Sequence, residues 1–360
     1  MSEICLKNIR KTYENGTTVI ENLNLKIESG SFTVLVGPSG CGKSTTLRMI
    51  AGLEDTTDGE IYIDGKLMNH VEPGDRDIAM VFQNYALYPT MTVKGNIEFG
   101  LINAKVPKAE RERLIEEIAG IVDLTEHLHK KPSQLSGGQR QRVALARAMV
   151  KKPKVFLMDE PLSNLDAKLR NQMRSELIEL HHKLGVTFVY VTHDQVEALS
   201  MATDIVLMEK GVIRQHSTPH EIYASPQNIF TAQFIGTPEM NILTRDKVNK
   251  CLELQPEVGY IGFRPSKVKI YEEGDETKEK FVFKGSVLTR EMLGSEVIYR
   301  IQTKMGVIAI KVFNDVELEI EDEVKLSLAY KHMYGFDYNK DRIQGLSLIH
   351  ISEPTRLQLI

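Results

Sequence analysis

The feature that most constrains the fold is a glycine-rich loop between an apolar run and a helix-like stretch. The apolar run covers Phe32 to Val36, and the helix-like stretch covers Thr46 to Leu53. Strand, loop and helix in this order are the context that a phosphate-binding loop requires. The loop residues are Gly37, Pro38, Ser39, Gly40, Cys41, Gly42, Lys43, Ser44 and Thr45.

This phosphate loop predicts a site for a nucleoside triphosphate and Mg²⁺. Glycines let the backbone turn tightly so that successive N–H groups face phosphate oxygens, and the following helix N-terminus adds partial positive charge. We expect Lys43 to hold the β- and γ-phosphates and Ser44 to ligate Mg²⁺. Taken alone, these nine residues could also be a glycine-rich turn that occurs by chance. The motifs further along the chain argue against that alternative.

Two acidic residues end a second apolar run. Asp159 and Glu160 follow Val155 to Met158. A buried parallel strand would deliver both carboxylates to the C-terminal edge of the sheet, where ligands of open α/β folds bind. Asp159 suits the metal shell, and Glu160 suits the base that orients or polarises the attacking water. Taken alone, such a pair is more often a helix cap or a solvated edge.

Two more polar side chains follow strand-like runs. Gln83 ends the run Ile78 to Phe82, and His193 follows the run Thr187 to Thr192. We expect His193 to reach a γ-phosphate from the same sheet edge, and Gln83 to sense the metal ion and the water. A lone histidine would usually start a helix beside Asp194, and Gln83 alone would carry no meaning.

With these motifs, the chain resembles the nucleotide-binding subunit of an ABC transporter over residues 1 to about 235. In that family a short signature motif caps the ATP held by the phosphate loop of the opposite subunit. This chain matches the motif at Leu135, Ser136, Gly137, Gly138 and Gln139. The resemblance therefore implies a paired ATPase that binds ATP and Mg²⁺, with donors from Ser136, Gly137 and Gly138 opposite Lys43.

The resemblance also implies single-residue roles. Tyr13 resembles the aromatic residue that stacks on adenine, although a tyrosine after the strand-like Ile4 to Ile9 would ordinarily be half-buried packing. Gln83 resembles the glutamine loop, Asp166 the acid of the inter-subunit loop, and His193 the switch histidine. ATP would bind the closed dimer far better than the open one.

Charge and cysteine content limit the partners and the compartment. Lys and Arg total 45 against 49 Asp and Glu, so we expect no nucleic-acid partner. No leader-like segment and no run of about 18 apolar residues is visible. Cys5, Cys41 and Cys251 are too scattered for a disulfide framework or a zinc site, which favours a reducing compartment. Cys41, beside Lys43 at a helix start, is a candidate thiolate whose alkylation would block ATP binding; a small residue chosen for fit is the alternative.

Between Gln83 and the signature motif we predict a helical insert, at about residues 88–152. Apolar residues at helical spacing, expected to be core rather than interface, are Leu114, Ile115, Ile118, Ile121 and Val122. An aromatic group lies just after Gln83, at Tyr85, Leu87, Tyr88 and Pro89. In the family this region receives a short helix from each membrane subunit, whereas packing of the insert onto the core is the alternative. Thr90 departs from the histidine that sugar importers often have there.

A second domain is predicted over residues 236–343, after the breaker Gly236, Thr237 and Pro238. Its predicted strands are Tyr260 to Arg264, Val268 to Ile270, Phe281 to Leu288, Glu296 to Ile301, Val307 to Val312 and Val324 to Leu328. This spacing indicates a small barrel or sandwich, with an OB-like barrel favoured. The charged stretch Glu272 to Lys280 is interpreted as a solvated turn.

This second domain resembles the regulatory domain of carbohydrate-importer ATPases. The resemblance is carried by Phe234 to Gly236 with Pro238, Met240 and Asn241, then Gly262 to Pro265, then Leu293 to Glu296. Polyamine and metal-ion importers share parts of this pattern. It implies extra dimer contacts and, in some members, regulator binding, of which we favour the plain dimerisation module. Residues 344–360, with Ser347 to Arg356 resembling translated adapter, are predicted to be a non-native or disordered tail.

The sequence thus predicts an α/β P-loop NTPase core with a helical insert, followed by a small all-β OB-like regulatory domain. The resemblance implies the ATP-hydrolysing subunit of an importer of oligosaccharides or glycerol 3-phosphate, at the cytoplasmic face of the membrane. Implied partners are a second ATPase subunit, identical or not, two membrane permease subunits and, indirectly, an external solute-binding protein. The alternatives are a polyamine or ion importer ATPase and a soluble ABC ATPase acting on ribosomes or DNA.

Overall fold

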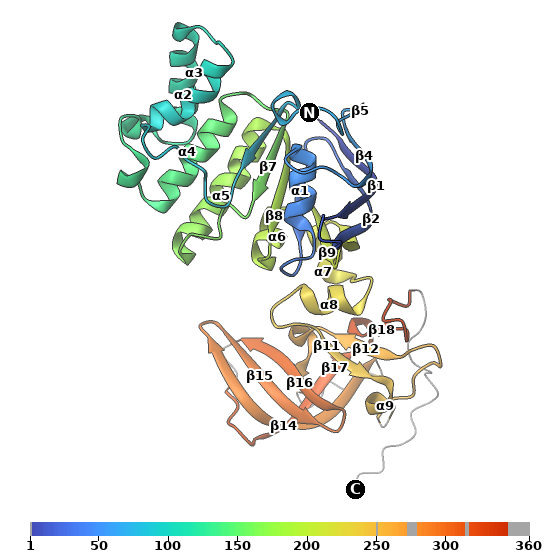
Figure 1. Cartoon of the computed structure of the whole chain (residues 1–360). Helices are drawn as coiled ribbons and strands as arrows, with labels where there is room; N and C mark the ends of the chain where they lie inside the picture. The colour runs from blue at the N-terminus through green and yellow to red at the C-terminus, as the bar shows by residue number, and fades with distance from the viewer. Residues whose placement is uncertain (1, 250, 272–278, 314–316, 345–360) are drawn as a thin grey trace. The chain divides into compact units, whose positions relative to one another are not determined.

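The computed structural model describes residues 2–249, 251–271, 279–313 and 317–344 (Figure 1). Its contacts form two compact units, Met1–His220 and Glu221–Ile360. The division therefore falls before residues 221–235, which the sequence analysis placed in the first domain. The predicted tail and most of the charged stretch Glu272 to Lys280 lie outside the described residues.

A mainly parallel sheet forms the centre of the first unit, with strand order β10-β9-β3-β8-β7-β6. Its strands are β3 (Phe32–Val36), β6 (Ile78–Val81), β7 (Val155–Asp159), β8 (Thr187–Thr192), β9 (Asp204–Glu209) and β10 (Val212–Ser217). Only β10 runs antiparallel to its neighbour, at one edge of the sheet. Every residue of β3, β7 and β8 is buried, as expected for parallel strands covered on both faces.

Helices cover the two faces of this sheet differently. On one face, α1 (Lys43–Ala51) packs with a four-stranded antiparallel sheet through a shared apolar core. That sheet has the order β2-β1-β4-β5, from β2 (Thr18–Ile27), β1 (Ile4–Thr12), β4 (Asp58–Ile63) and β5 (Lys66–Leu67). The other face carries α5 (Ala167–Leu184) and α6 (Gln195–Met201), and the ring of His181 lies against Phe32 and Phe188 there.

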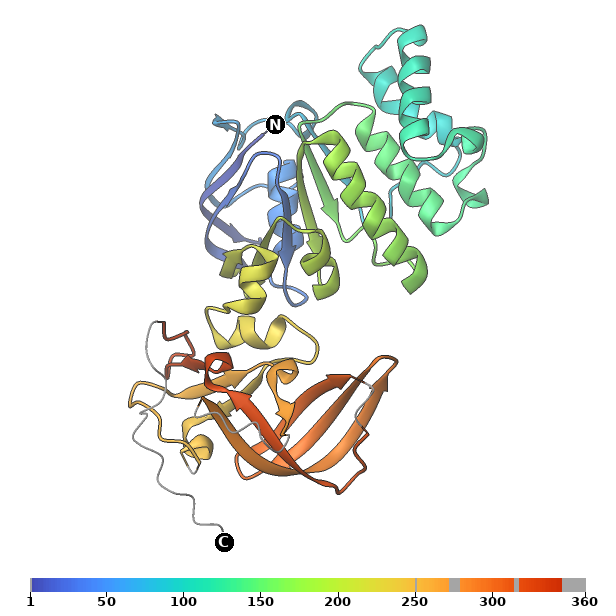
Figure 2. The ribbon, with the colours of Figure 1, turned by 180° about the vertical axis from the view of Figure 1, so that it is seen from behind.

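The helical insert lies to one side of the sheet (Figures 1 and 2). It comprises α2 (Val93–Asn103), α3 (Lys108–Ile121) and α4 (Gly137–Met149), with short turns η2 (Thr125–His127) and η3 (Pro132–Gln134). A further short turn, η1 (Pro73–Asp75), precedes β6. Leu114, Ile115, Ile118 and Val122 are buried, and Ile121 is half-buried. The predicted core role of this apolar stripe is confirmed.

Two sheets build the second unit. The first has the order β11-β12-β18, from β11 (Asn241–Thr244), β12 (Tyr260–Phe263) and β18 (Tyr334–Phe336). The second has the order β13-β17-β14-β15-β16, from β13 (Lys269–Ile270), β17 (Glu323–Ala329), β14 (Lys280–Leu293), β15 (Glu296–Thr303) and β16 (Gly306–Phe313). Each predicted strand is present, and β11 and β18 are additional. The larger sheet is strongly curved into a half-barrel (Figure 2), and the predicted small all-β OB-like domain is confirmed.

Short helices complete this unit, namely α7 (Pro219–Ala224), α8 (Ile229–Phe234), α9 (Arg245–Val248), η4 (Pro265–Lys267) and η5 (Tyr330–His332). Arg264, directly after β12, explains why α8 belongs here. Its buried guanidinium donates to the carbonyl oxygens of Tyr223, Ala232 and Ile235. Burial lowers the pKa of Arg264, whose three acceptors are neutral. These bonds attach residues 223–235 to the β domain. The boundary between the two units therefore lies nearer the N-terminus than the predicted boundary after residue 235.

Candidate functional site

The phosphate loop requires glycine at specific positions. Gly37 has φ +154°, and a Cβ atom there would lie 2.2 Å from the carbonyl oxygen of Met208. Gly42, which precedes α1, has φ +103°, a region that side chains rarely adopt. Pro38, Ser39 and Gly40 are exposed at the tip of the loop. The backbone is thus shaped as a cradle, open to solvent at its tip.

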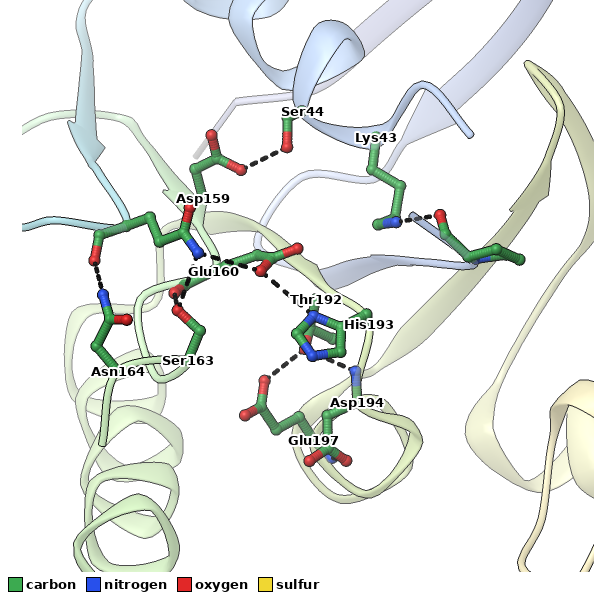
Figure 3. A network of polar contacts seen from close by, with 12 residues as sticks. Lys43, Ser44, Asp159, Glu160, Ser163, Asn164, Thr192, His193, Asp194 and Glu197 are labelled. Carbon is green, nitrogen blue, oxygen red and sulfur yellow. Dashed lines mark hydrogen bonds and ion pairs between the residues drawn. The ribbon is translucent and has the colours of Figure 1, made fainter. Parts of the chain in front are cut away.

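Lys43 lies buried on the inner side of this loop. Its Nζ donates to the carbonyl oxygens of Gly37 and Pro38, at 2.8 Å each, and lies 3.6 Å from the Sγ of Cys41. The ammonium group is therefore held within the cradle, next to the backbone that would surround a phosphate (Figure 3).

The expectation of a reactive thiolate at Cys41 is wrong. Cys41 is buried, and burial raises the pKa of its thiol, against a smaller lowering by the Lys43 charge. Desolvation disfavours the charged form of any acid, and here it outweighs the neighbouring cation. The alternative is that position 41 needs a small side chain for packing. It agrees with the close contact to Gly37, where an added Cβ atom would lie 2.9 Å from Sγ of Cys41.

Ser44 and Asp159 form an oxygen-rich pair at the start of α1 and the end of β7. The hydroxyl of Ser44 donates to Oδ1 of Asp159 at 2.7 Å, and Arg48 lies 3.8 Å from Oδ2. Hydroxyl and carboxylate oxygens are the ligands that Mg²⁺ prefers. The pair therefore fits the predicted metal site in its chemistry.

Glu160, Gln83 and His193 meet at the ends of three strands of the central sheet. Figure 3 shows Glu160 facing the His193 ring. The Oε2 atom of Glu160 lies 3.3 Å from Nδ1 of His193 and 3.5 Å from Nε2 of Gln83. Glu160 has φ +46°, a left-handed conformation that is uncommon for a non-glycine residue, and its N–H donates to the carbonyl oxygen of Val191. Two of the predicted catalytic side chains, Gln83 and His193, thus contact the carboxylate of the third, Glu160.

Two residues for which the sequence predicted no role, Asn164 and Ser163, hold Gln83 in place. Asn164 donates from its side chain to the carbonyl oxygen of Gln83, at 3.0 Å. Ser163 accepts from the Gln83 amide at 3.3 Å and donates to the carbonyl oxygen of Glu160 at 2.8 Å. Their position three and four residues after Glu160 was the only signal available in the sequence.

Tyr13 lies beside the phosphate loop. Its hydroxyl is 3.3 Å from Oγ1 of Thr45, and the ammonium of Lys11 lies 5.0 Å from the centre of its ring. The side chain is half-buried. This geometry places an aromatic ring at the loop's edge, and a role in adenine stacking stays a prediction.

The signature motif forms the start of α4. Ser136 caps the helix and shares a capping box with Gln139, in which each side chain accepts from the other's backbone N–H. Gly138 packs so closely that a Cβ atom would lie 2.9 Å from Leu169. Asp166 caps α5 by accepting from the N–H of Leu169. Among the described residues, no hydrogen bond or ion pair joins Ser136, Gln139 or Asp166 to the phosphate loop.

The aromatic group after Gln83 divides into buried and exposed members. Tyr85 is buried, and Arg147 donates to the carbonyl oxygens of Tyr85 and Ala86. Tyr88 is 38% exposed and its ring lies against Phe99. Packing of the insert therefore explains Tyr85, whereas Tyr88 and Pro89 lie at the surface.

Within the described ranges, none of the helices combines the length and apolar character needed to span a membrane. The same residues contain no group of three or more His, Cys, Asp or Glu side chains arranged to hold a metal ion.

Comparisons with known proteins agree with this geometry. A family model described as ABC transporter matches residues 20–163, and one described as TOBE domain matches residues 261–336. An sn-glycerol-3-phosphate import ATP-binding protein of Psychromonas ingrahamii is 45% identical, with 94% of each chain covered. An oligosaccharides import ATP-binding protein of Bacillus subtilis is 46% identical, covering 94% of this chain and 96% of that protein.

Solved structures also resemble the chain. A protein from Clostridium perfringens, described as part of an ABC transporter complex, shares 27% identity and a TM-score of 0.58, over 62% of this chain and 90% of that one. A dimeric ATP-binding cassette, described as a post-hydrolysis state bound to ADP and Pi, shares 35% identity and a TM-score of 0.55, over 60% of this chain and 98% of that one.

The phosphate loop, the converging strand ends and these matches define the class: the chain belongs to the ABC transporter family, as an ATP-binding subunit that hydrolyses ATP. Within that family it groups with the import ATP-binding proteins, and it carries their cassette together with a C-terminal TOBE domain.

Proposed function

We propose that this chain is the energy-coupling ATPase of an importer for oligosaccharides or glycerol 3-phosphate, and that Mg²⁺ is its cofactor. The observation that carries the catalytic part is the convergence of Glu160, His193 and Gln83 at one sheet edge. This edge is also where the Ser44–Asp159 pair lies. The names and high identity of the relatives support the transport part.

In this proposal the phosphate loop binds the triphosphate of the substrate ATP through its backbone N–H groups. Lys43 exchanges its bonds to the Gly37 and Pro38 carbonyl oxygens for phosphate oxygens, which are stronger acceptors because they are charged. Ser44 and Asp159 would hold Mg²⁺, which would supply positive charge next to the phosphates. Tyr13 stacks on the adenine.

Glu160 orients and deprotonates the attacking water. The His193 ring and the Gln83 amide both contact its Oε2 atom, so the carboxylate is oriented before the substrate arrives. His193, whose side chain is 59% exposed, reaches the γ-phosphate from the end of β8. Gln83, held by Ser163 and Asn164, senses the metal ion and the water.

A second ATPase subunit, identical or not, completes each site. The exposed hydroxyl of Ser136 and the N–H groups of Gly137 and Gly138 donate to the triphosphate on the opposite subunit's phosphate loop. Gln139 holds Ser136 in position and Asp166 lies at the subunit boundary. Because both subunits contact the same γ-phosphate, its hydrolysis releases the closed dimer.

The remaining partners are two permease subunits and, indirectly, an external solute-binding protein. The subunit then lies peripherally on the cytoplasmic face of the membrane. Tyr88 and Pro89, exposed beside Gln83, supply the surface for a permease helix. The TOBE unit adds dimer contacts. The first unit, Met1–His220, acts as the nucleotide-binding domain, and the second unit, which begins at Glu221, acts as the regulatory domain.

Glu160→Gln tests the chemistry. The amide keeps the size of the side chain and cannot accept the water proton, so we expect ATP affinity to be retained and turnover to fall about a hundredfold or more. Size-exclusion chromatography with ATP should show a trapped dimer. Glu98→Gln, which changes a half-buried carboxylate paired with Arg111 in the insert, is the matched control with unchanged turnover. Wild-type turnover in Glu160→Gln would refute the assignment.

Uptake tests the cargo. Host cells carrying the native gene or Glu160→Gln are given labelled oligosaccharides, glycerol 3-phosphate and spermidine. Loss of uptake of one sugar or of glycerol 3-phosphate in the variant supports the proposal. Loss of spermidine uptake alone supports a polyamine importer instead. No loss at all, with co-sedimentation on ribosomes or binding to DNA, would favour a soluble ABC ATPase.

A further inference from the structure

A buried carboxyl group lies next to His193. Glu197, in the first turn of α6, is only 4% exposed. Its Oε2 atom accepts from the hydroxyl of Tyr190 at 2.8 Å and from the hydroxyl of Thr192 at 2.7 Å. Both donors come from the end of β8, the strand that precedes His193. Burying a carboxyl group costs free energy unless it is hydrogen-bonded, and here one oxygen atom collects two donors.

The hydroxyl of Thr192 links this carboxyl group to the backbone beyond His193. It donates to Glu197 and also accepts from the N–H of Asp194 at 3.0 Å. The Asp194 carboxylate in turn accepts from the N–H groups of Val196 and Glu197. The residues on both sides of His193 are therefore tied to the same point at the start of α6 (Figure 3).

The His193 ring itself has little support from side chains. Its polar contact among the described residues is the Oε2 atom of Glu160, at 3.3 Å, and the side chain is 59% exposed. The position of the ring is accordingly set by the backbone from Thr192 to Asp194. Whatever fixes that backbone also fixes the distance between His193 and Glu160.

The two carboxylates of Glu160 and Glu197 border one small polar cavity. It has a volume of about 40 Å³, and its lining is completed by Ser163, Arg170, Thr192, His193 and Asp194. Arg170 also lies 3.8 Å from the Asp194 carboxylate. Glu197 is thus joined to the residues next to His193 by hydrogen bonds and lines the same cavity as Glu160.

We propose that Glu197 is a positioning residue that, through Tyr190 and Thr192, holds His193 opposite Glu160. The inference rests on the proposed role of His193 at the γ-phosphate. It explains a buried carboxyl group that the phosphate loop, the metal pair and the signature motif do not use. The Glu197 carboxyl group contacts the hydroxyls of Tyr190 and Thr192, so its proposed action on the reaction is indirect.

The first test is Glu197→Gln in the full-length chain. Both hydroxyl bonds fall on one oxygen of Glu197, and the amide oxygen of glutamine is a weaker, uncharged acceptor for them, so the end of β8 loosens. We expect kcat for ATP hydrolysis to fall about tenfold, because small displacements of a reacting group are costly, while KM for ATP stays within about twofold. Glu98→Gln, paired with Arg111 in the insert, is the matched control and should leave kcat unchanged.

A double-mutant cycle separates positioning from general stability. In a His193→Ala background, Glu197→Gln should cause no further fall in kcat, because the group that it positions is gone. An equal fall in both backgrounds would overturn the inference while leaving the proposed function intact. Wild-type turnover in His193→Ala alone would overturn both.

Tyr190→Phe provides a second variant that keeps the ring and removes one donor to Glu197. It should lower kcat about threefold in the wild-type background and leave it unchanged beside His193→Ala. If Glu197→Gln fails to fold, this variant decides the question by the same cycle. A full wild-type kcat in Tyr190→Phe, with Glu197→Gln unfolded, would count against the positioning role.

Discussion

The side-chain nitrogen of Gln139 lies 2.9 Å from Nε2 of His127. The Oε1 atom of Gln139 accepts from the N–H of Ser136, so the amide nitrogen is the donor and the imidazole Nε2 is the acceptor. A histidine in η2 therefore supports the capping box at the start of the signature helix. The sequence showed nothing of this, because His127 precedes the signature motif and belongs to no motif of its own.

His127→Leu should lower turnover about fivefold, with ATP affinity unchanged. Loss of the acceptor frees the Gln139 amide and loosens Ser136, which acts on the nucleotide of the opposite subunit in the proposed dimer. His127→Gln retains an acceptor oxygen and should keep turnover near wild type. Steady-state ATP hydrolysis of both variants checks this, and equal losses would show that the acceptor is not what matters.

Lys43→Ala should weaken ATP binding about tenfold or more without unfolding the protein. In the structure, Nζ bonds to two carbonyl oxygens of its own loop, so its removal costs the fold little, whereas charge-assisted bonds to phosphate are lost. Calorimetric titration with ATP measures the affinity. Lys94→Ala, an exposed lysine paired with Glu112, is the control. Unchanged affinity in Lys43→Ala would contradict the role of the loop.

Cys41 should react with N-ethylmaleimide much more slowly than Cys251. Cys251 is exposed, whereas Cys41 is buried and burial raises the pKa of its thiol, so little thiolate forms near neutral pH. Peptide mass spectrometry over time distinguishes the two sites. Fast labelling of Cys41 in the folded protein would restore the thiolate hypothesis.

The free energy of unfolding should fall as the pH drops from about 7.5 to 5.5, in part because of His181. Burial against Phe32 and Phe188 lowers the pKa of His181 below its ordinary value. The folded state therefore favours the neutral ring, and its contribution is complete above the unfolded pKa and is lost as the pH falls through the folded value. One such group changes stability by at most about 1.4 kcal/mol per pH unit.

His181→Gln tests this contribution, since glutamine can still donate to the carbonyl oxygen of Gly30, as His181 does, and cannot titrate. Urea unfolding at a series of pH values should show a shallower pH dependence for the variant than for the wild type. Parallel curves would show that His181 does not contribute to the pH dependence of the free energy of unfolding.

Much of the site was predictable because its residues sit at the ends of strands with strong apolar signals. The mainly apolar runs before Gly37 and Asp159 predict buried parallel strands, and parallel strands place their C-terminal ends at one edge. The convergence of Gln83, Glu160 and His193 follows from that rule. The assignment of Glu160 as the water-activating base still needs the kinetic test.

Other features depend on tertiary contacts that no local pattern encodes. In the sequence, Arg264 is a single polar residue after a predicted strand. Its hydrogen bonds to Tyr223, Ala232 and Ile235 attach those residues to the second unit, which no local pattern indicates. Strands β11 and β18 are short and gain their order from pairing with β12. The raised pKa of Cys41 likewise reflects burial, which sequence position beside Lys43 could not show.

The central sheet has a consequence for how the protein is made on the ribosome. Strand β3, which leads into the phosphate loop, lies between β8 and β9, whose residues follow it by more than 150 positions. The carbonyl oxygen of Met208 packs against Gly37, and the N–H of Gly211 donates to the carbonyl oxygen of Cys41. A nascent chain that ends before β8 contains every residue of the phosphate loop. It lacks the strands β8 and β9 and the residues Met208 and Gly211 that pack against the loop. Nucleotide therefore cannot assist folding until nearly the whole first unit has emerged.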